Sequence, residues 1–257
     1  MRVLVTFAVE AEFAPWRKLR KFRERKLCAE HWSGGVCVET TQIADHTVYV
    51  FLTGIGITFF DFAVAKCFKE AGVGVVISSG LAGSLKELYP ALTIVCPSRV
   101  GGLTDATGTA VTRAVFELAV KNNATAIETL LTSSHIIDSH EEKARLAMFA
   151  DAVDMESGQI IAAFLQEQIP VGVIRAISDG SEEDLPIDFE QCLTSSGRVK
   201  TIPLLKELAR NPGKVPELIR FGRQSRAAAE KLAGFLDGFI QLLRPELLLG
   251  ETEERVF

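Results

Sequence analysis

Apolar positions along the chain alternate between short β-branched runs and longer segments in which apolar residues recur three or four positions apart. The short runs predict strands, at 2–8, 36–43, 47–53, 73–79, 92–96 and 127–133. The longer segments predict helices, at 10–25, 58–70, 110–122 and 139–149. This alternation favours a single α/β domain, a three-layer α/β/α sandwich in which helices cover both faces of a mixed, largely parallel sheet.

One stretch, from Ala152 to Asp179, combines these elements with acidic residues. Its pattern predicts strand, acidic turn, helix and strand, with Asp154 and Glu156 at the turn and Asp179 where the second strand ends. The mostly apolar run 171–177 is typical of a strand that is covered on both faces. Open α/β sheets bind ligands beyond the carboxyl ends of their strands, so we expect these acids to face one cleft.

Turns, loops and C-terminal helices account for the rest of the chain, and we expect one domain over 1–244. A hairpin is predicted where Ala44-Asp45-His46 separates two strands. The other segments are a loop and candidate lid at 99–108, a long loop over the strand ends at 180–197, two C-terminal helices at 198–244 divided near Asn211-Pro212-Gly213, and a frayed acidic tail at 245–257.

The composition is that of a globular protein with no general affinity for nucleic acid. The 257 residues are 47% hydrophobic and carry a net charge of -5. Five cysteines without a CxxC pair indicate reduced thiols, and four histidines without ligand spacing indicate no metal site. The most apolar window, 49–60, is shorter than the ~20 residues of a membrane-spanning helix. We therefore expect a cytoplasmic protein without a bound metal.

Two glycine-rich turns that follow predicted strands, at 54–56 and 80–83, raise the question of a dinucleotide cofactor. Gly54 and Gly56 follow a predicted strand, but Phe59 stands where the third glycine of that motif belongs. The first strand is followed by Glu10 and Glu12, whose carboxylates would repel a pyrophosphate. The sequence therefore argues against a dinucleotide site, and no cofactor is expected.

Five short segments carry a family resemblance. They are AVEAE at 8–12, TGIG at 53–56, SSGLAG at 78–83, VDMES at 153–157 and RAISD at 175–179. In this order and spacing they resemble the nucleoside phosphorylase and nucleosidase superfamily, with most likeness to the 5′-methylthioadenosine/S-adenosylhomocysteine nucleosidase branch. The resemblance implies a small-molecule adenine nucleoside as substrate, cleavage of its N-glycosidic bond, and a homodimer or larger homo-oligomer.

The resemblance also implies roles for the three residues nearest the chemistry. Asp179 matches the general acid that protonates the purine, which is a poor leaving group as an anion. A carboxyl group that donates at neutral pH needs a pKa raised by burial. Glu12 matches the base that positions or deprotonates the attacking water, and Arg175 matches the arginine that helps to fix this water. Two carboxyl groups on opposite sides of the scissile bond parallel glycoside hydrolysis.

Other matching positions are expected to bind the substrate. Glu156 matches the residue that binds the ribose hydroxyls, and Met155 would pack under the sugar. The remaining candidates are Gly80 in the glycine segment, Val9 near the 5′ pocket, and the backbone of Ile136 and Ile137 at the adenine edge. Leu81 is a departure, because the nucleosidases have serine there beside the water.

The charge of the nucleophile separates hydrolysis from phosphorolysis. A phosphorylase needs cations for phosphate, whereas this chain has Glu10 and Glu12 at the first turn and Ile57-Thr58 after TGIG. Hydrolysis is favoured, with a phosphate-dependent purine nucleoside phosphorylase and a catalytically degenerate nucleoside-binding protein as alternatives.

Structural interpretations of the same residues stand beside these roles. Glu10 and Glu12 would suit the first turn of any helix. Asp154 and Ser157 are best explained as helix caps. Asp179 alone would suit a turn, and Arg175 a buried ion pair with a structural acid. Singly, each structural interpretation is favoured; five segments in family order favour catalysis.

The segment 198–226 is basic and amphipathic. Its eight basic residues are Arg198, Lys200, Lys206, Arg210, Lys214, Arg220, Arg223 and Arg226. Such a segment can lie on an anionic membrane, but a helix packed on the core with a solvated basic face is favoured. Leu185-Pro186 and the Arg-Asn-Pro-Gly break also resemble the hopanoid-associated branch, which removes adenine from a nucleoside with a 5′ lipid. We therefore hypothesise that the 5′ pocket, near Val9 and 99–108, accepts a bulky apolar group.

Overall fold

The computed structural model describes residues 1–29, 32–57, 60–102, 105–187, 189–192, 194 and 212–249. The strands are β1 (Arg2–Phe7), β2 (Arg23–Ala29), β3 (Trp32–Ile43), β4 (His46–Leu52), β5 (Val75–Ser84), β6 (Ile94–Gly102), β7 (Asp105–Ala110), β8 (Thr125–Thr132), β9 (Ala152–Asp154) and β10 (Val171–Asp179). The helices are α1 (Glu10–Leu19), α2 (Phe62–Glu70), α3 (Arg113–Lys121), α4 (His140–Leu146), α5 (Ser157–Gln166), α6 (Phe189–Cys192), α8 (Val215–Leu242) and α9 (Pro245–Leu249), with short 3₁₀ turns at Ile55–Ile57 and Pro212–Lys214.

Within the described residues the strands form one mixed sheet of ten strands. β1 lies between β4 and β5 and is parallel to both, and β5 is parallel to β10 on its other side. β10 then pairs with β6, β6 with β8, β8 with β9, and β9 with β5, so that five strands close into a ring. The predicted α/β fold with a mixed sheet is confirmed, and the carboxyl ends of β1, β4, β5 and β10 meet at one edge.

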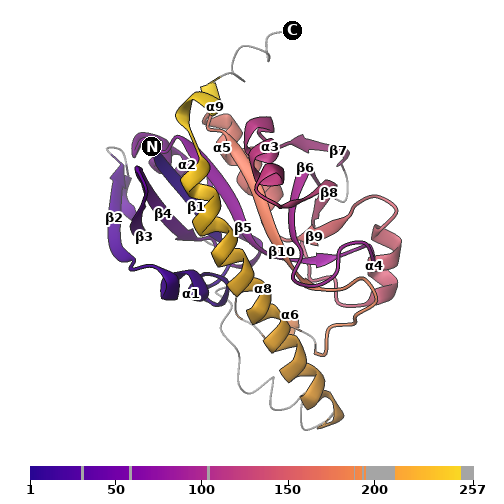
Figure 1. Cartoon of the computed structure of the whole chain (residues 1–257). Coiled ribbons are helices and arrows are strands. Elements are labelled where there is room, and N and C mark those ends of the chain that lie inside the picture. Colours follow the sequence, from indigo (N-terminus) through magenta and orange to yellow (C-terminus); the bar gives the residue numbers. More distant parts are fainter. Residues whose placement is uncertain are drawn as a thin grey trace.

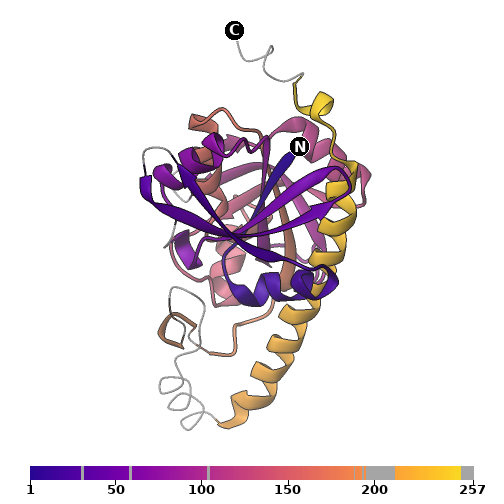
Figure 2. The same cartoon turned by 90° about the vertical axis from the view of Figure 1, so that its left-hand side faces the viewer.

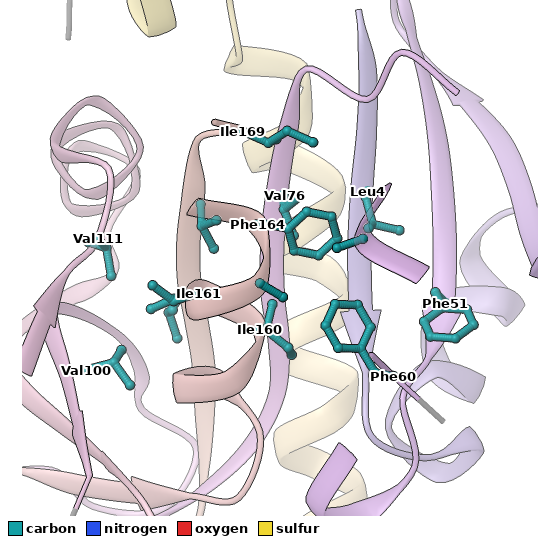
Figure 3. Packing of buried hydrophobic residues seen from close by; sticks show 14 of the residues in the cluster. Leu4, Phe51, Phe60, Val76, Val100, Val111, Ile160, Ile161, Phe164 and Ile169 are labelled. Carbon is teal, nitrogen blue, oxygen red and sulfur yellow. The ribbon is translucent and has the colours of Figure 1, made fainter. Parts of the chain in front are cut away.

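Helices cover both faces of the sheet, each over its own apolar cluster. On one face α2 and α5 pack on the sheet, where the rings of Phe60 and Phe164 lie 5.5 Å apart (Figure 3). On the other face α1, α3 and α8 bury residues such as Trp16 and Phe239. α8 crosses in front of the strands in Figure 1, and its N-terminal end reaches beyond them in Figure 2. Every residue of β10 is buried, which confirms the prediction of a strand covered on both faces.

The first predicted helix is too long in the sequence interpretation. α1 ends at Leu19, because Arg20 is extended, and the chain from Arg23 becomes β2, which pairs antiparallel with β3. The predicted helix 10–25 places Phe22 at helical spacing with Trp16. Its ring still packs 5.4 Å from that of Trp16, but the chain reaches this place after turning back. Helical spacing therefore described the contact correctly and the backbone incorrectly.

Two predicted loops are strands. The segment 80–83 was expected to be a glycine turn after a strand, yet β5 continues through it to Ser84 and pairs with β10 along its length. The candidate lid at 99–108 is also wrong as a loop, because β6 and β7 form an antiparallel pair there, with residues 103 and 104 outside the described chain. The hairpin of β3 and β4 and the elements of 152–179 are as predicted.

The C-terminal part is more ordered than a frayed tail. α9 covers residues 245–249, and Leu248 is buried in the cluster under α8, so that prediction is wrong for these residues. The remaining tail, 250–257, and the first of the two expected C-terminal helices lie outside the described residues. Asp237 of α8 accepts hydrogen bonds from Trp16 and Arg20, which fastens α8 to the N-terminal helix.

Of the basic segment 198–226, the structure describes the part from Pro212 onward. Arg220 and Arg226 are largely exposed on α8 and pair with Glu183 and Glu230. No helix within the described ranges combines the length and apolar character that a membrane crossing requires.

Candidate active site

Glu12 is held at the carboxyl ends of β1 and β5 by three backbone N–H groups. It lies in the first turn of α1, and its side chain bends back toward the strand. Its Oε2 accepts hydrogen bonds from the N–H groups of Ala8 (2.9 Å) and Val9 (3.3 Å). Its Oε1 accepts one from the Leu81 N–H (2.8 Å). Burial raises the pKa of Glu12 above its ordinary value, although Arg175 and the three N–H groups act in the opposite direction.

Arg175 places a guanidinium in the middle of β10, where almost no solvent reaches it. Its Nε and Nη2 both donate to Asp154 Oδ2, at 2.9 and 2.6 Å. Nη2 also donates to the hydroxyl groups of Ser157 (2.9 Å) and Ser78 (3.2 Å). Burial disfavours this charge, but Asp154, Glu156 and Glu12 outweigh it and raise the pKa of Arg175. A permanent cation is therefore fixed inside a group of carboxylates.

Asp154 is the carboxylate that pairs directly with Arg175. From the sequence it was interpreted as a helix cap. The cap is present, since Asp154 accepts from the Ser157 N–H at the start of α5, and Thr132 donates to its Oδ1. Ser157 was also expected to cap, but it is the first residue of α5 and its hydroxyl group faces Arg175 and Ser78. The clue in the sequence was an aspartate in the same acidic turn as Glu156.

Glu156 joins the acidic turn to the glycine turn after β4. Its Oε1 accepts from the Gly56 N–H (3.1 Å), and its Oε2 lies 3.9 Å from Arg175 Nη2. Burial and the neighbouring Asp154 raise the pKa of Glu156 to about 8. Met155 is half-buried beside the same turn, with its Cε 4.0 Å from the place where Gly56 would carry a Cβ. The expected grouping of Glu156 and Met155 is therefore present.

Gly80 allows Glu12 and Arg175 to come together above β5. A Cβ on Gly80 would lie 2.5 Å from Arg175 Nη1 and 2.9 Å from Glu12 Oε1, and φ at this residue is +140°. Leu81 turns its side chain to the opposite face, where it packs on the cluster under α8. Its contribution to the site is the backbone N–H that binds Glu12.

Asp179 ends β10 in a second, separate group of polar contacts. Its Oδ1 is 2.5 Å from Ser178 Oγ, and its Oδ2 accepts from Lys143 Nζ at 2.5 Å. A Cβ on Gly83 would lie 3.1 Å from the same Oδ2. A Cβ on Gly80 would meet Glu12 and a Cβ on Gly83 would meet Asp179, so the two acids contact β5 at different positions.

Lys143 and Ser178 were not proposed from the sequence as site residues. Ser178 lies inside the RAISD segment, so its nearness to Asp179 could have been read from adjacency. Lys143 offered no such signal, because it stands in α4 within the run His-Glu-Glu-Lys, which is typical of a solvated helix face. α4 lies within the predicted helix 139–149, and Ser139 caps it by accepting from the Glu142 N–H.

Of three predicted contact residues, Ile136 and Ile137 lie apart from the charged groups and Val9 lies beside them. Ile137 is buried in a small cluster with Leu131 and Val153, and Ile136 is half-buried beside it between β8 and α4. Val9 is half-buried at the end of β1 and meets Glu12 through its N–H. In the described ranges, no three acidic, histidine or cysteine side chains form a metal-binding group.

Known proteins match most of this chain. A family model described as "Phosphorylase superfamily" matches residues 2–208. A 5′-methylthioadenosine/S-adenosylhomocysteine nucleosidase from Shewanella denitrificans is 26% identical over 235 residues, which cover 81% of this chain and 100% of the relative.

Solved structures with the same fold include two from Helicobacter pylori. A futalosine hydrolase mutant has a TM-score of 0.68 at 17% identity and covers 95% of this chain and 100% of its own. A 5′-methylthioadenosine/S-adenosylhomocysteine nucleosidase in complex with butyl-thio-DADMe-Immucillin-A has a TM-score of 0.67 at 17% identity and covers 95% of this chain and 99% of its own. At these identities the structures establish the fold.

Replacing Gly80 with alanine is expected to destabilise the protein by about 1–3 kcal/mol, because the methyl group meets Arg175 and Glu12 and φ is positive. Gly102→Ala is the matched control, since Gly102 is also in a strand and has no neighbour within 4 Å of the added Cβ. Urea unfolding measures both variants. Equal midpoints for the two variants would contradict the close approach above Gly80.

Glu156 is expected to make stability depend on pH. Its pKa is about 8 in the folded protein against an ordinary 4.5, so between these values the folded state keeps a proton that the unfolded state has lost. The free energy of unfolding should therefore fall as pH rises from 5 to 8. The free energy of unfolding of Glu156→Gln should fall less steeply over this range, although Glu12 still contributes in the same direction. Urea midpoints at several pH values test this, and equal slopes would exclude a buried, proton-bearing Glu156.

Proposed function

Because the chain belongs to the phosphorylase superfamily, we propose that it is a nucleosidase, which cleaves the N-glycosidic bond of a nucleoside with water as the nucleophile. The observation that carries this proposal is the charge around Glu12. Within the described part of the chain, Glu12, Asp154 and Glu156 surround one cation, Arg175, which already donates twice to Asp154. Asp154 neutralises Arg175, and Glu156 carries a proton at neutral pH. No cation among the described residues therefore remains for an anionic phosphate, which the Glu12 carboxylate would repel; a neutral water would not be repelled.

Glu12 is suited to act as the base for that water. Its carboxylate is held rigidly by three N–H groups, and its raised pKa makes it a better proton acceptor than an exposed glutamate. Water attacks the anomeric carbon of the sugar and its proton passes to Glu12. Arg175, whose Nη1 lies beside Gly80, helps to orient the water and limits the repulsion between the carboxylates.

Asp179 completes the reaction on the other side of the bond. As the C–N bond breaks, its electron pair moves to the purine, and Asp179 gives a proton to the ring nitrogen so that the base leaves neutral. Glu12 and Asp179 contact β5 at different glycines, and we place the sugar and the base between these two acids. Glu156 and Met155 lie on the sugar side, where Glu156 binds the hydroxyl groups and Met155 packs under the ring.

The proposed substrate is an adenine nucleoside with a 5′ substituent, without any cofactor. The resemblance of the VDMES and RAISD segments and the similarity to the Shewanella denitrificans nucleosidase support this choice. The backbone of Ile136 and Ile137 is the candidate for the adenine edge, and Val9 for the 5′ side. The alternative is a phosphate-dependent reaction, which would be recognised by a sugar 1-phosphate product.

The test is the identity of the sugar product. Methylthioadenosine, S-adenosylhomocysteine, adenosylhopane and unsubstituted adenosine are incubated with the protein, with and without phosphate, and the products are analysed by mass. We expect adenine and the free sugar from a 5′-substituted nucleoside, at a rate that phosphate does not change.

Glu12→Gln is the matched variant, because glutamine keeps the size of the side chain and removes the base. It should lower turnover by about 100-fold or more, since general-base catalysis contributes on that order. A sugar 1-phosphate would contradict hydrolysis, and a preference for unsubstituted adenosine would contradict the 5′ assignment.

A further inference from the structure

Lys143 has no contact with solvent, and its ammonium group points at Asp179. Its Nζ donates to Asp179 Oδ2 at 2.5 Å, to the Gly180 carbonyl oxygen at 2.9 Å and to the Glu183 carbonyl oxygen at 2.7 Å. An ammonium group has three hydrogens, so all of them are used. A lysine is rarely buried in this way without a specific partner. Here the partner is the carboxyl group that the proposed function makes the general acid.

The three contacts fix the orientation of the Asp179 carboxyl group. An ammonium group has no acceptor, so the oxygen that faces it must accept and cannot carry a proton on that side. Lys143 therefore reserves Oδ2 as an acceptor. A proton that Asp179 delivers has to be on Oδ1.

Ser178 provides a place for that proton. Its hydroxyl oxygen is 2.5 Å from Asp179 Oδ1 and 3.2 Å from the Ala82 carbonyl oxygen. A hydroxyl group has one hydrogen, and the carbonyl can only accept. When Asp179 is ionised, Ser178 donates to Oδ1. When Asp179 is protonated, Oδ1 donates to Ser178, Ser178 donates to Ala82, and every group keeps a partner.

We propose that Lys143 is a positioning residue for the acid step: it holds Oδ2 of Asp179 so that the proton given to the purine is carried on Oδ1. This inference rests on the proposed nucleosidase function and adds a residue to it. Lys143 does not touch the substrate; it acts through Asp179. In the step itself the proton moves from Oδ1 to the leaving base, and Lys143 keeps all of its own hydrogens.

The contacts of Lys143 also connect the acid to the C-terminal helix. Glu183, whose carbonyl oxygen binds Lys143, accepts through its carboxylate from the Gly180 N–H (3.0 Å) and from Gln224 of α8 (2.9 Å). Gln224 donates as well to the Ser178 carbonyl oxygen (2.9 Å). The segment after β10 is thus bound by Lys143 and by Gln224, which keeps the ammonium group of Lys143 opposite the carboxyl group of Asp179.

The experiment compares Lys143→Met with Asp179→Asn and with the double variant. Adenine release is followed with a radiolabelled purine, so that slow variants remain measurable. Lys143→Met should lower kcat by about 10- to 100-fold, a part of what general-acid catalysis contributes, with KM within about threefold of the wild-type value. If Lys143 acts through Asp179, the double variant should be no more than about threefold slower than Asp179→Asn alone.

Lys86→Met is the matched control, because Lys86 also pairs with an aspartate, Asp151, at 2.6 Å but has no contact with Asp179. It should leave kcat within about twofold of the wild-type value, as expected for a change without contact to the acid. The double variant leaves no unpaired charge, so a double variant more than about threefold slower than Asp179→Asn still overturns the role if Lys143→Met does not fold.

Two results would overturn the role of Lys143: a kcat for Lys143→Met within about threefold of wild type, or losses that multiply in the double variant. Failure of the wild-type protein to release adenine would instead reject the nucleosidase function. The two failures are therefore distinguishable.

Discussion

The structure depends on a buried positive charge in the centre of its sheet. Arg175 lies within β10 with 1% of its surface exposed, and an uncompensated charge at such a place would cost several kcal/mol. Asp154, Ser78 and Ser157 accept from its Nε and Nη2, and they come from three different elements. The middle of β5, the end of β9 and the start of α5 must therefore meet at β10 for the protein to fold.

The same requirement explains why the carboxyl groups of the site have unusual properties. The acids that gather around Arg175 are themselves buried, and burial raises the pKa of Glu12 and of Glu156. Replacing such clusters by apolar residues is often neutral or stabilising, so a chemical role explains this cluster better than stability does. Asp179 sits apart, with its own buried cation, Lys143. Two carboxyl groups with different partners suit a base and an acid in one reaction.

The sequence was most informative where structure is local. The pattern of 152–179 predicted β9, α5 and β10. Short segments singled out Glu12, Glu156, Arg175 and Asp179; the structure brings Glu12 and Glu156 to Arg175 and places Asp179 at the end of β10. It failed where the structure depends on distant partners. Residues 80–83 form a strand because they pair with β10. The local sequence Gly-Leu-Ala-Gly does not show this distant partner.

The same limit applies to charges. Lys143 has acidic neighbours in the sequence and no apolar periodicity, so nothing nearby predicts that it is buried. Its buried partner is Asp179, which is 36 positions away. Asp154 was recognised as a cap, because capping is local, and its pairing with Arg175 was not. Pairings across the sheet are set by tertiary packing, which a single sequence does not display.

The most direct measurement of the acid–base mechanism is a comparison of binding and chemistry in Asp179→Asn. Asparagine can still accept from Lys143, so the site should keep its shape. Calorimetric titration with methylthioadenosine is expected to give an affinity close to that of the wild-type protein, while single-turnover adenine release slows by about 100-fold or more, as removal of a general acid requires. Adenine release at the wild-type rate would mean that Asp179 belongs to the scaffold, and the assignment of the two carboxyl groups would be wrong.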